Sequence, residues 1–177
     1  LRVPASGSID LTHRCNFRCA HCYLGTARSH AGADRELSTR RWQTIIDEFT
    51  HAGCLFLLIS GGEPLLRNDF LDSYTHAKNS GLLVTVFTNG SLLSDGIVER
   101  FVDLPPQGVE VSIYGATEGT FDAVAGVSGA YRRRLGRNAG VAAAGWRVRP
   151  KTIPLPLESR GVPSMTTIAG AFGGDFS

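Results

Sequence analysis

The sequence lacks the features of a membrane protein and those of a disordered one. Its longest uninterrupted apolar run, residues 54–59, covers six positions, whereas a helix that crosses a bilayer needs about 20. Only 19% of the 177 residues are charged, while 42% are hydrophobic and nine are Phe. That composition can bury one core and excludes disorder. No basic and then apolar leader opens the sequence, so a secretory signal peptide is not expected.

The chain also lacks a strong net charge, but its charges are unevenly distributed. Residues 1–129 carry 10 basic and 14 acidic side chains, a net −4, whereas residues 130–177 carry 8 and 2, a net +6. On a helix, Arg133 and Arg137 share a face, while adjacent arginines spread around it. We interpret this cluster as a solvated helix surface, with docking of an acidic redox partner or peptide as the alternative. Nucleic acid is disfavoured, because no aromatic side chains are interleaved to stack on bases.

Short apolar runs alternate with helical patterns along the chain. Strands are expected at residues 8–13, 55–59, 82–87, 109–113 and 147–157. Helices are expected to begin at Ser38, Asn68 and Ser94, and to span residues 131–144 and 163–172. Five such units predict a parallel sheet and are too few for a closed eight-stranded barrel, so the predicted fold is α/β, a partial, open TIM-like barrel. The fifth strand contains Pro150, Pro154 and Pro156, which lack backbone donors, so either it lies at an edge or its local sequence is unusual for the fold.

Three of the four cysteines, Cys15, Cys19 and Cys22, lie within eight residues directly after the first predicted strand. Three thiolates this close together can hold one metal centre, but they do not complete a four-cysteine site. Cys54 precedes the second strand, so about six residues at ~3.3 Å each, roughly 20 Å, separate it from the other three. We therefore expect Cys54 to be a buried core residue rather than a fourth ligand.

Two motifs at consecutive strand ends resemble the signatures of one enzyme family. The Cys-x3-Cys-x2-Cys loop at residues 15–22 follows the first strand, and Gly-Gly-Glu-Pro at residues 61–64 follows the second. Together they resemble the radical S-adenosylmethionine superfamily. The resemblance continues through Thr-Asn-Gly at residues 88–90 and through residues 112–117, at the ends of the next two strands. It is closest to the peptide- and protein-modifying branch with a SPASM-type C-terminal extension.

The resemblance implies a four-iron, four-sulfur (4Fe-4S) cluster and S-adenosylmethionine as cofactors. The metal ligands would be Cys15, Cys19 and Cys22, with the fourth iron left to bind the amino and carboxylate groups of S-adenosylmethionine. The residues expected to bind the cofactor are His21, Gly61, Gly62, Glu63, Pro64, Asn89, Ser112 and Ile153. All but Ile153, on the fifth strand, lie in the segments that follow the first four strands or at their ends, where α/β barrels place their chemistry.

The resemblance implies a distinct role for most of these positions. Gly61 and Gly62 have no side chains and would let the ligand approach the strand edge. The Glu63 carboxylate would accept hydrogen bonds from the cofactor's ammonium group. Ser112 would contact the ribose, and the ring of His21 and the side chain of Ile153 would lie beside the adenine.

The resemblance implies an enzyme that reductively cleaves S-adenosylmethionine to methionine and a 5′-deoxyadenosyl radical, which then abstracts hydrogen from a peptide or protein substrate. Flavodoxin or ferredoxin would supply the electron, and a reducing compartment, the cytoplasm, is expected for the thiolates. Residues 1–177 would form a radical SAM core that ends before a sixth β/α unit and a SPASM extension. Two alternatives stay open: a non-catalytic iron–sulfur or zinc-binding module, completed by His21 or His13, and an RNA-modifying member of the superfamily.

Overall fold

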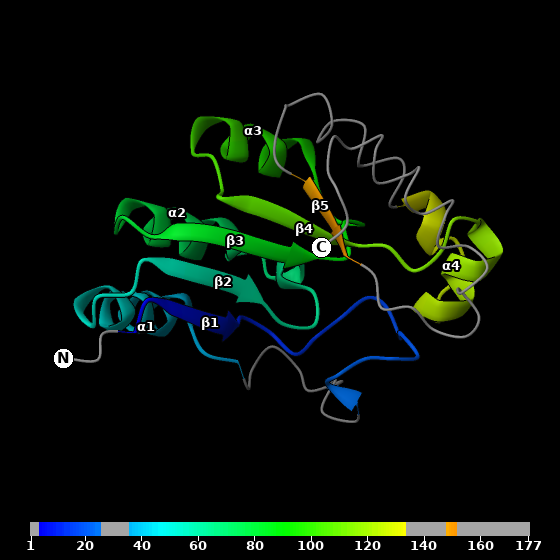
Figure 1. Ribbon diagram of the computed structural model, residues 1–177, viewed down its shortest axis with the longest axis horizontal. Coiled ribbons are helices and arrows are strands. Elements are labelled where there is room, and N and C mark those ends of the chain that lie inside the picture. Colours follow the sequence, from blue (N-terminus) through cyan, green and yellow to red (C-terminus); the bar gives the residue numbers. More distant parts are fainter. Residues whose placement is uncertain (1–3, 26–35, 134–147, 152–177) are drawn as a thin grey trace.

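The computed structural model describes residues 4–25, 36–133 and 148–151. Five strands of this part form one parallel sheet in the order β1-β2-β3-β4-β5, as Figure 1 shows. They are β1 (Ser6–Asp10), β2 (Phe56–Ser60), β3 (Leu83–Thr88), β4 (Gly108–Ser112) and β5 (Val148–Lys151). Since neighbouring strands are consecutive in the chain and parallel, each crossover brings the chain back to the end of the sheet at which all strands begin. The open α/β architecture expected from the sequence is confirmed.

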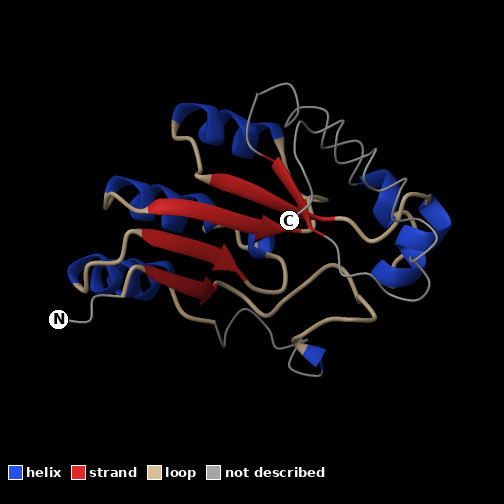
Figure 2. Ribbon diagram, viewed as in Figure 1, coloured by secondary structure: helices blue, strands red, loops and turns tan. Residues whose placement is uncertain are grey.

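The helices that follow the first strands pack on one face of the sheet. They are α1 (Thr39–His51), α2 (Phe70–Asn79) and α3 (Asp95–Asp103), with a short 3-10 helix, η3 (Pro64–Leu66), before α2. Figure 2 shows these helices on one side of the sheet and α4 (Glu118–Ala125) apart from them, beyond the strand ends. No helix in the described ranges has the length and apolar character that a membrane span requires.

Alternate residues of each strand face these helices and form the main core. Val84 and Val86 of β3 are fully buried, and so are Ile46 of α1 and Tyr74 of α2, which belong to the same cluster. Cys54 is 8% exposed and lies in this cluster, as the sequence predicted. The intervening strand residues point to the opposite, concave face, which carries no helix within the described ranges.

Most element boundaries agree with the expected ones to within about two residues. The first strand ends at Asp10, three residues before the expected end at His13, and the expected end of the fifth strand, residue 157, lies outside the described part. Three further differences concern the helices. Ser38 caps α1, as expected, and its side chain accepts a hydrogen bond from the backbone N of Arg41. The prediction that Asn68 caps α2 was wrong, because the N-cap of that helix is Asp69. Helix α4 was not predicted, because its eight residues follow Gly115 and contain Gly119, a poor helix former. The expected helix at 131–144 begins at Ala130, and residues 134–147 lie outside the described part.

The fifth strand stands at the end of the described sheet, the first of the two alternatives that its prolines left open. Pro150 pairs in register with Val111 of β4, and no described strand lies on its other side. A residue without a backbone donor is tolerated in that position because the unpaired edge needs none. Ile153, Pro154, Pro156 and the helix expected at 163–172 lie outside the described residues.

Candidate active site

A cavity of about 320 Å³ opens where the strands end. Its wall includes the three clustered cysteines, Cys15, Cys19 and Cys22. Five of the eight residues expected to bind a cofactor also line it, namely His21, Gly61, Gly62, Asn89 and Ser112. Segments that are far apart in the sequence therefore meet at the carboxyl edge of a parallel sheet, the edge at which ligands of such sheets bind.

The cysteine loop is held by α4. The backbone N–H groups of Arg18 and Ala20 donate to the carbonyls of Ala125 and Val124 at the last turn of that helix, at 2.8 and 3.0 Å. These bonds satisfy helix-end carbonyls that have no partner within the helix. Gly126, which ends α4 with φ +65°, lies against the Arg18 carbonyl, and a Cβ there would approach its oxygen to 2.5 Å.

A small second core fixes the loop on this helix. Phe17, between the first two cysteines, is fully buried, and its ring meets that of Phe121 edge-to-face with the centroids 6.4 Å apart. Cys15 and Cys19 pack against this cluster. The short loop therefore has an apolar anchor of its own, which keeps the cysteine sulfurs beside the cavity while the main core lies behind the sheet.

Gly61 and Gly62 pack closely against the backbone of the segment that leads into the cysteine loop. The N–H of Gly62 donates to the Thr12 carbonyl at 2.7 Å, and the N–H of Glu63 donates to the Arg14 carbonyl at 2.8 Å. A Cβ on Gly61 would collide with Thr12, and one on Gly62 with Arg14; Gly61 also has φ +135°, which favours glycine. Close approach of the chain to itself thus explains both glycines, although both also line the cavity.

The Glu63 side chain has other partners than the expected cofactor ammonium. It is fully buried, and its carboxylate accepts bonds from the hydroxyl of Thr88 at 2.8 Å and from the backbone N–H groups of Asn89 and Leu65 at 2.7 and 3.1 Å. Burial raises its pKa to about 7. Glu63 therefore ties the end of β2 to the end of β3, and neither it nor the buried Pro64, which starts η3, belongs to the cavity lining.

Asn89 connects the cavity wall to the cysteine loop. Its Nδ2 donates to Oδ1 of Asn16 at 2.8 Å, and Nδ2 of Asn16 donates to the Ser91 hydroxyl at 2.8 Å. Oδ1 of Asn89 accepts from the N–H and the hydroxyl of Ser91. The Thr-Asn-Gly segment is thus a turn whose side chains hold the loop beside the first cysteine.

Ionic contacts support the other end of the loop. Glu36 accepts bonds from Nε and Nη2 of Arg14 at 3.0 Å, from Nη1 of Arg67 at 3.1 Å and from the Thr12 hydroxyl. Arg67, whose side chain is 7% exposed, also pairs with Asp69 at 2.6 Å. Because Arg14 directly precedes Cys15, this network fixes the start of the loop to the segment before α2. No sequence pattern indicated that these four charges meet.

His21 and Ser112 lie on the cavity wall beside Tyr114. The rings of His21 and Tyr114 meet edge-to-face with the centroids 4.8 Å apart. Within the described residues, the buried Nδ1 of His21 has no hydrogen-bond partner, and burial lowers the pKa of this imidazole, which favours its neutral form. A flat, neutral ring with an unpaired nitrogen at a cavity suits a contact with an aromatic base. Ile153, the other residue expected there, lies outside the described residues.

The thiols fit an iron–sulfur cluster in their chemistry and placement. The four cysteines form no disulfide, and burial raises the pKa of the Cys15 thiol to about 11, so this sulfur needs a metal to become a thiolate. Across the described ranges, no three His, Cys, Asp or Glu side chains converge to bind a single metal ion. A 4Fe-4S cluster distributes its thiolates over separate irons, so its ligands need not meet at one ion.

Comparisons with known proteins agree with this geometry. The profile of the Radical SAM superfamily matches residues 9–144, which include the cysteine loop and the segments that line the cavity. The chain belongs to the radical SAM superfamily. Its members use a 4Fe-4S cluster and S-adenosylmethionine as cofactors.

Several radical SAM proteins resemble the chain over most of its length. PqqA peptide cyclase of Bradyrhizobium diazoefficiens is 32% identical over 133 residues, 75% of this chain and 34% of the relative. AdoMet-dependent heme synthase of Methanosarcina barkeri is 40% identical over 126 residues, 71% of this chain and 36% of the relative. The chain thus spans about a third of the length of these curated relatives.

The fold recurs in solved structures of SuiB from Streptococcus suis. The structure bound to S-adenosylmethionine has a TM-score of 0.80 at 16% identity and covers 96% of this chain and 37% of SuiB. The structure bound to the precursor peptide SuiA has the same TM-score at 18% identity, with 93% and 36% covered. At such identities the similarity concerns the fold.

Sequence reasoning missed several residues of the cavity wall, among them Phe87 and Lys151. Phe87 is on the same face of β3 as Leu83 and Thr85, and Lys151 is paired in register with Ser112 of β4. Their two-residue alternation was visible, but it does not say which face is concave. That requires the positions of the helices.

Proposed function

We propose that the chain is the cofactor-binding part of a radical SAM enzyme that modifies a peptide. The observation that carries the proposal is the cavity at the strand ends, which is lined by Cys15, Cys19 and Cys22 together with Gly61 and Gly62. Membership of the superfamily supports the same assignment over residues 9–144.

The cluster would be held by Cys15, Cys19 and Cys22, with S-adenosylmethionine against Asn89, Ser112 and His21. When bound, the cluster supplies the electron that cleaves S-adenosylmethionine and so yields the radical that abstracts hydrogen. The chain's own residues orient and shield these groups. Phe17 and Tyr114 line the cavity and keep part of its wall apolar, and the hydroxyl of Tyr23 donates to the Gly61 carbonyl at 3.1 Å and to Asp10 at 3.2 Å.

Glu63 and Pro64 contribute to the same site indirectly. Glu63 holds the turn that carries Asn89, and Pro64 starts the 3-10 helix that follows the glycine pair. We infer that they position cofactor contacts, while Ile153 stays a proposed adenine contact because it lies outside the described residues.

A peptide substrate is supported by two relatives. One is named for the cyclisation of the peptide PqqA, and SuiB has been solved with its precursor peptide SuiA. A second candidate comes from the relative with 40% identity, which is named a heme synthase, so a heme precursor is the rival substrate class.

We further propose that the chain is part of a longer protein, in which a sixth β/α unit and a SPASM extension follow. The support is that it spans about a third of its relatives. Flavodoxin or ferredoxin would deliver the electron, and the cytoplasm would keep the thiols reduced.

Anaerobic reconstitution with iron and sulfide tests the proposed function. The protein should bind about four irons, absorb as an iron–sulfur protein and release 5′-deoxyadenosine from S-adenosylmethionine when dithionite is added. Cys19→Ala should abolish both the cluster and the release, whereas Cys54→Ala, a change in the core behind the sheet, should retain them. A protein that binds only zinc, or a cluster unaffected by Cys19→Ala, would contradict the proposal.

A further inference from the structure

The concave face of the sheet carries charged side chains on its first strand, β1, and on its last strands, β4 and β5. Phe87 of β3 pairs in register with Glu110 of β4, and Glu110 pairs with Arg149 of β5. One step further toward the carboxyl edge, Ser112 pairs with Lys151, and both line the cavity. Since alternate strand residues share a face, this row of side chains stands on the side away from the helices.

On the β5 side, two cations surround a single carboxylate. Nζ of Lys151 lies 2.5 Å from Oε2 of Glu110 and 4.0 Å above the centroid of the Phe87 ring, while Nη1 of Arg149 lies 3.9 Å from Oε1 of Glu110. Glu110 is 8% exposed, and its carboxylate lies between the two cations. The side chains of Lys151 and Arg149 remain 41% and 43% exposed. The group therefore keeps one positive charge in excess at the cavity.

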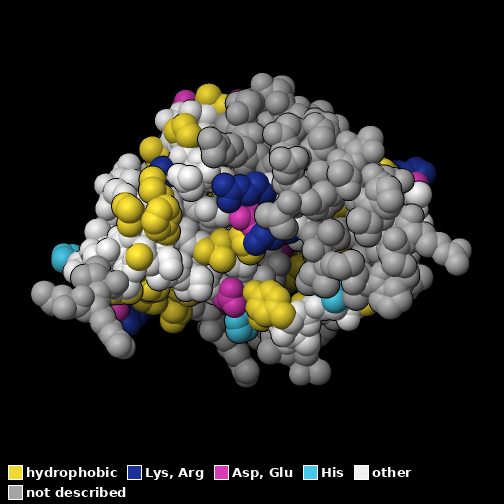
Figure 3. Space-filling model, in the orientation of Figure 1, with side chains coloured by type: hydrophobic (Ala, Val, Ile, Leu, Met, Phe, Trp, Pro, Cys, Tyr) yellow, Lys and Arg dark blue, Asp and Glu magenta, His cyan; other side chains and the backbone are white. Residues whose placement is uncertain are grey.

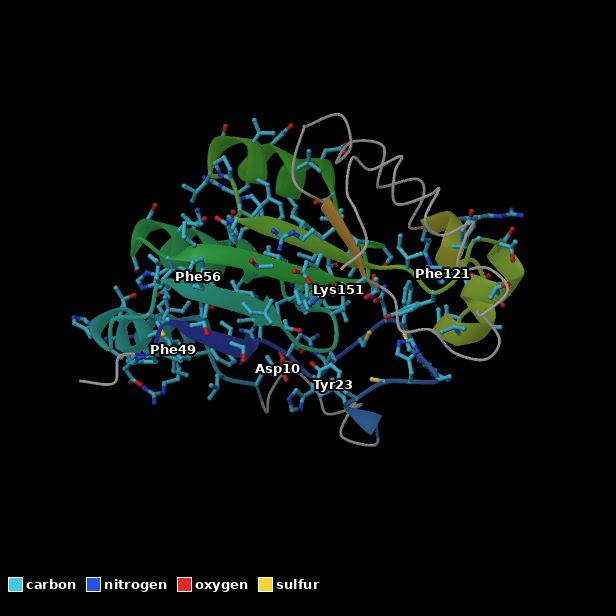
Figure 4. The ribbon with its side chains drawn as sticks, viewed as in Figure 1. Asp10, Tyr23, Phe49, Phe56, Phe121 and Lys151 are labelled. Carbon is cyan, nitrogen blue, oxygen red and sulfur yellow. The ribbon has the colours of Figure 1, made fainter. Side chains whose placement is uncertain are left out.

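On the β1 side, the charge has the opposite sign. Asp10 ends β1 in register with Ser60, a cavity residue, and accepts a bond from Tyr23. Figure 4 shows Lys151, Asp10 and Tyr23 along the carboxyl edge of the sheet, and Figure 3 shows basic groups beside an acidic one, next to hydrophobic side chains, on the same face. A ligand that lies along the carboxyl ends of the strands thus meets positive charge at β5 and negative charge at β1.

We propose that Lys151 and Arg149 form a carboxylate-binding subsite that selects a peptide substrate with an acidic side chain. Geometry and charge carry this assignment: Lys151 reaches the cavity, the Phe87 ring holds its ammonium in place, and Arg149 offers donors that Glu110 uses only loosely. A guest carboxylate would balance the excess charge and receive charge-assisted hydrogen bonds. The substrate class rests on the proposed function, whereas the preference for a carboxylate does not.

The test compares two capped peptides that differ in one group. The full chain, loaded with its cluster, is titrated with acetyl-Ala-Ala-Glu-Ala-Ala-amide and with the same peptide containing Gln, and binding is measured by NMR or calorimetry. We expect about tenfold tighter binding of the glutamate peptide, since hydrogen bonds to charged groups exceed neutral ones by that order. Lys151→Met should reduce the preference for the glutamate peptide to less than twofold, and Arg149→Gln should reduce it in part. Lys151→Arg, which keeps the positive charge, should retain most of the preference.

The control is Arg132→Gln, because Arg132 is 77% exposed, pairs with Glu118 and does not line the cavity. It should keep the full preference. Arg149→Gln leaves the Lys151–Glu110 pair intact, so it remains informative if Lys151→Met fails to fold. Wild-type protein that binds both peptides equally, or not at all, overturns the proposal, and so does a preference unchanged in both variants.

S-Adenosylmethionine also carries a carboxylate, and a second titration separates the two sources. Wild-type and variant proteins should bind S-adenosylmethionine with equal affinity. Weaker binding of the cofactor by the variants, with unchanged binding of its decarboxylated form, would assign the cations to the cofactor and overturn the substrate assignment. If wild-type protein binds no S-adenosylmethionine, the proposed function fails, while the peptide comparison, made without turnover, still decides the subsite.

Discussion

Single residues at this site mostly hold the chain in place around the cofactors. Glu63 and the pair Gly61-Gly62 stand in a family motif, and sequence reasoning assigned them to the ligand. The structure shows backbone contacts with Thr12 and Arg14 and a buried carboxylate that accepts three hydrogen bonds. A motif identifies which positions matter, and the structure adds which neighbours in the chain each of them contacts.

Gly126 gives the first prediction at this scale. Gly126→Ala should lower the free energy of unfolding by about 1–3 kcal/mol, because the residue has φ +65° and its new Cβ would press on the Arg18 carbonyl. Bound iron should fall as well, since Arg18 belongs to the cysteine loop. Gly119→Ala, inside α4 with open space around the added Cβ, should be neutral or slightly stabilising. Denaturant unfolding and iron analysis measure both, and equal effects of the two changes would refute the explanation.

Glu63 gives a prediction about pH. Its pKa in the folded protein, raised by burial to about 7, exceeds the ordinary value of 4.5. The unfolded chain therefore loses this proton first, and the contribution of Glu63 to stability is fully present below pH 4.5 and is lost as pH rises to 7. Relative to Glu63→Gln, wild-type protein should lose about 3 kcal/mol over this window.

Urea unfolding of the metal-free wild type and the Glu63→Gln variant at several pH values measures this difference. A difference that grows in favour of wild type between pH 4.5 and 7 would show that the three donors keep Glu63 ionised. In that case the carboxylate, and not the acid, is the form that ties β2 to β3.

At the scale of elements, the cysteine loop is fastened at three points: α4, the turn after β3 and the ionic network before α2. The strands and the first three helices were predictable, because their apolar periodicity and caps are local signals. The role of α4 was not, since its contacts with Phe17 and Arg18 join segments about 100 residues apart. The charges of Glu36 and Arg67 were visible in the sequence, but their meeting depends on the path of the loop between them.

Glu36 provides the prediction at this scale. Glu36→Gln should lower the free energy of unfolding by about 2–4 kcal/mol, because it leaves the buried guanidinium of Arg67 with Asp69 as its one remaining ion-pair partner among the described residues. The comparison is Glu48→Gln, in which an ion pair with Arg41, more than half exposed on both sides, is lost. That change should cost less than about 0.5 kcal/mol.

The same network should weaken in acid. Arg14, Thr12 and Arg67 keep the pKa of Glu36 below its usual value despite its burial, and Arg67 does the same for Asp69. Carboxylates with depressed pKa values stabilise the protein above their unfolded pKa of about 4, and the contribution disappears as pH falls through the folded value. Thermal melting between pH 3 and 6 should show this loss in wild-type protein and a smaller one in Glu36→Gln. Equal acid sensitivity of the two proteins would mean that the network is not coupled to folding.

At the scale of the whole molecule, the sheet separates stability from chemistry. One face packs on α1, α2 and α3 and holds the core, while the carboxyl edge gathers the cysteine loop, the turn after β3 and the charged concave face. The architecture was predictable because alternating strands and helices permit few topologies. The chain spans about a third of the length of its curated relatives.

The most direct measurement of the central claim is the electron paramagnetic resonance spectrum of the reduced, reconstituted protein before and after S-adenosylmethionine is added. Three cysteine ligands would leave one iron of the cluster open, so binding of the cofactor to that iron should change the g-values of the signal, and Cys54→Ala should show the same change. A cluster signal that is identical with and without S-adenosylmethionine would contradict the claim that this cavity joins the two.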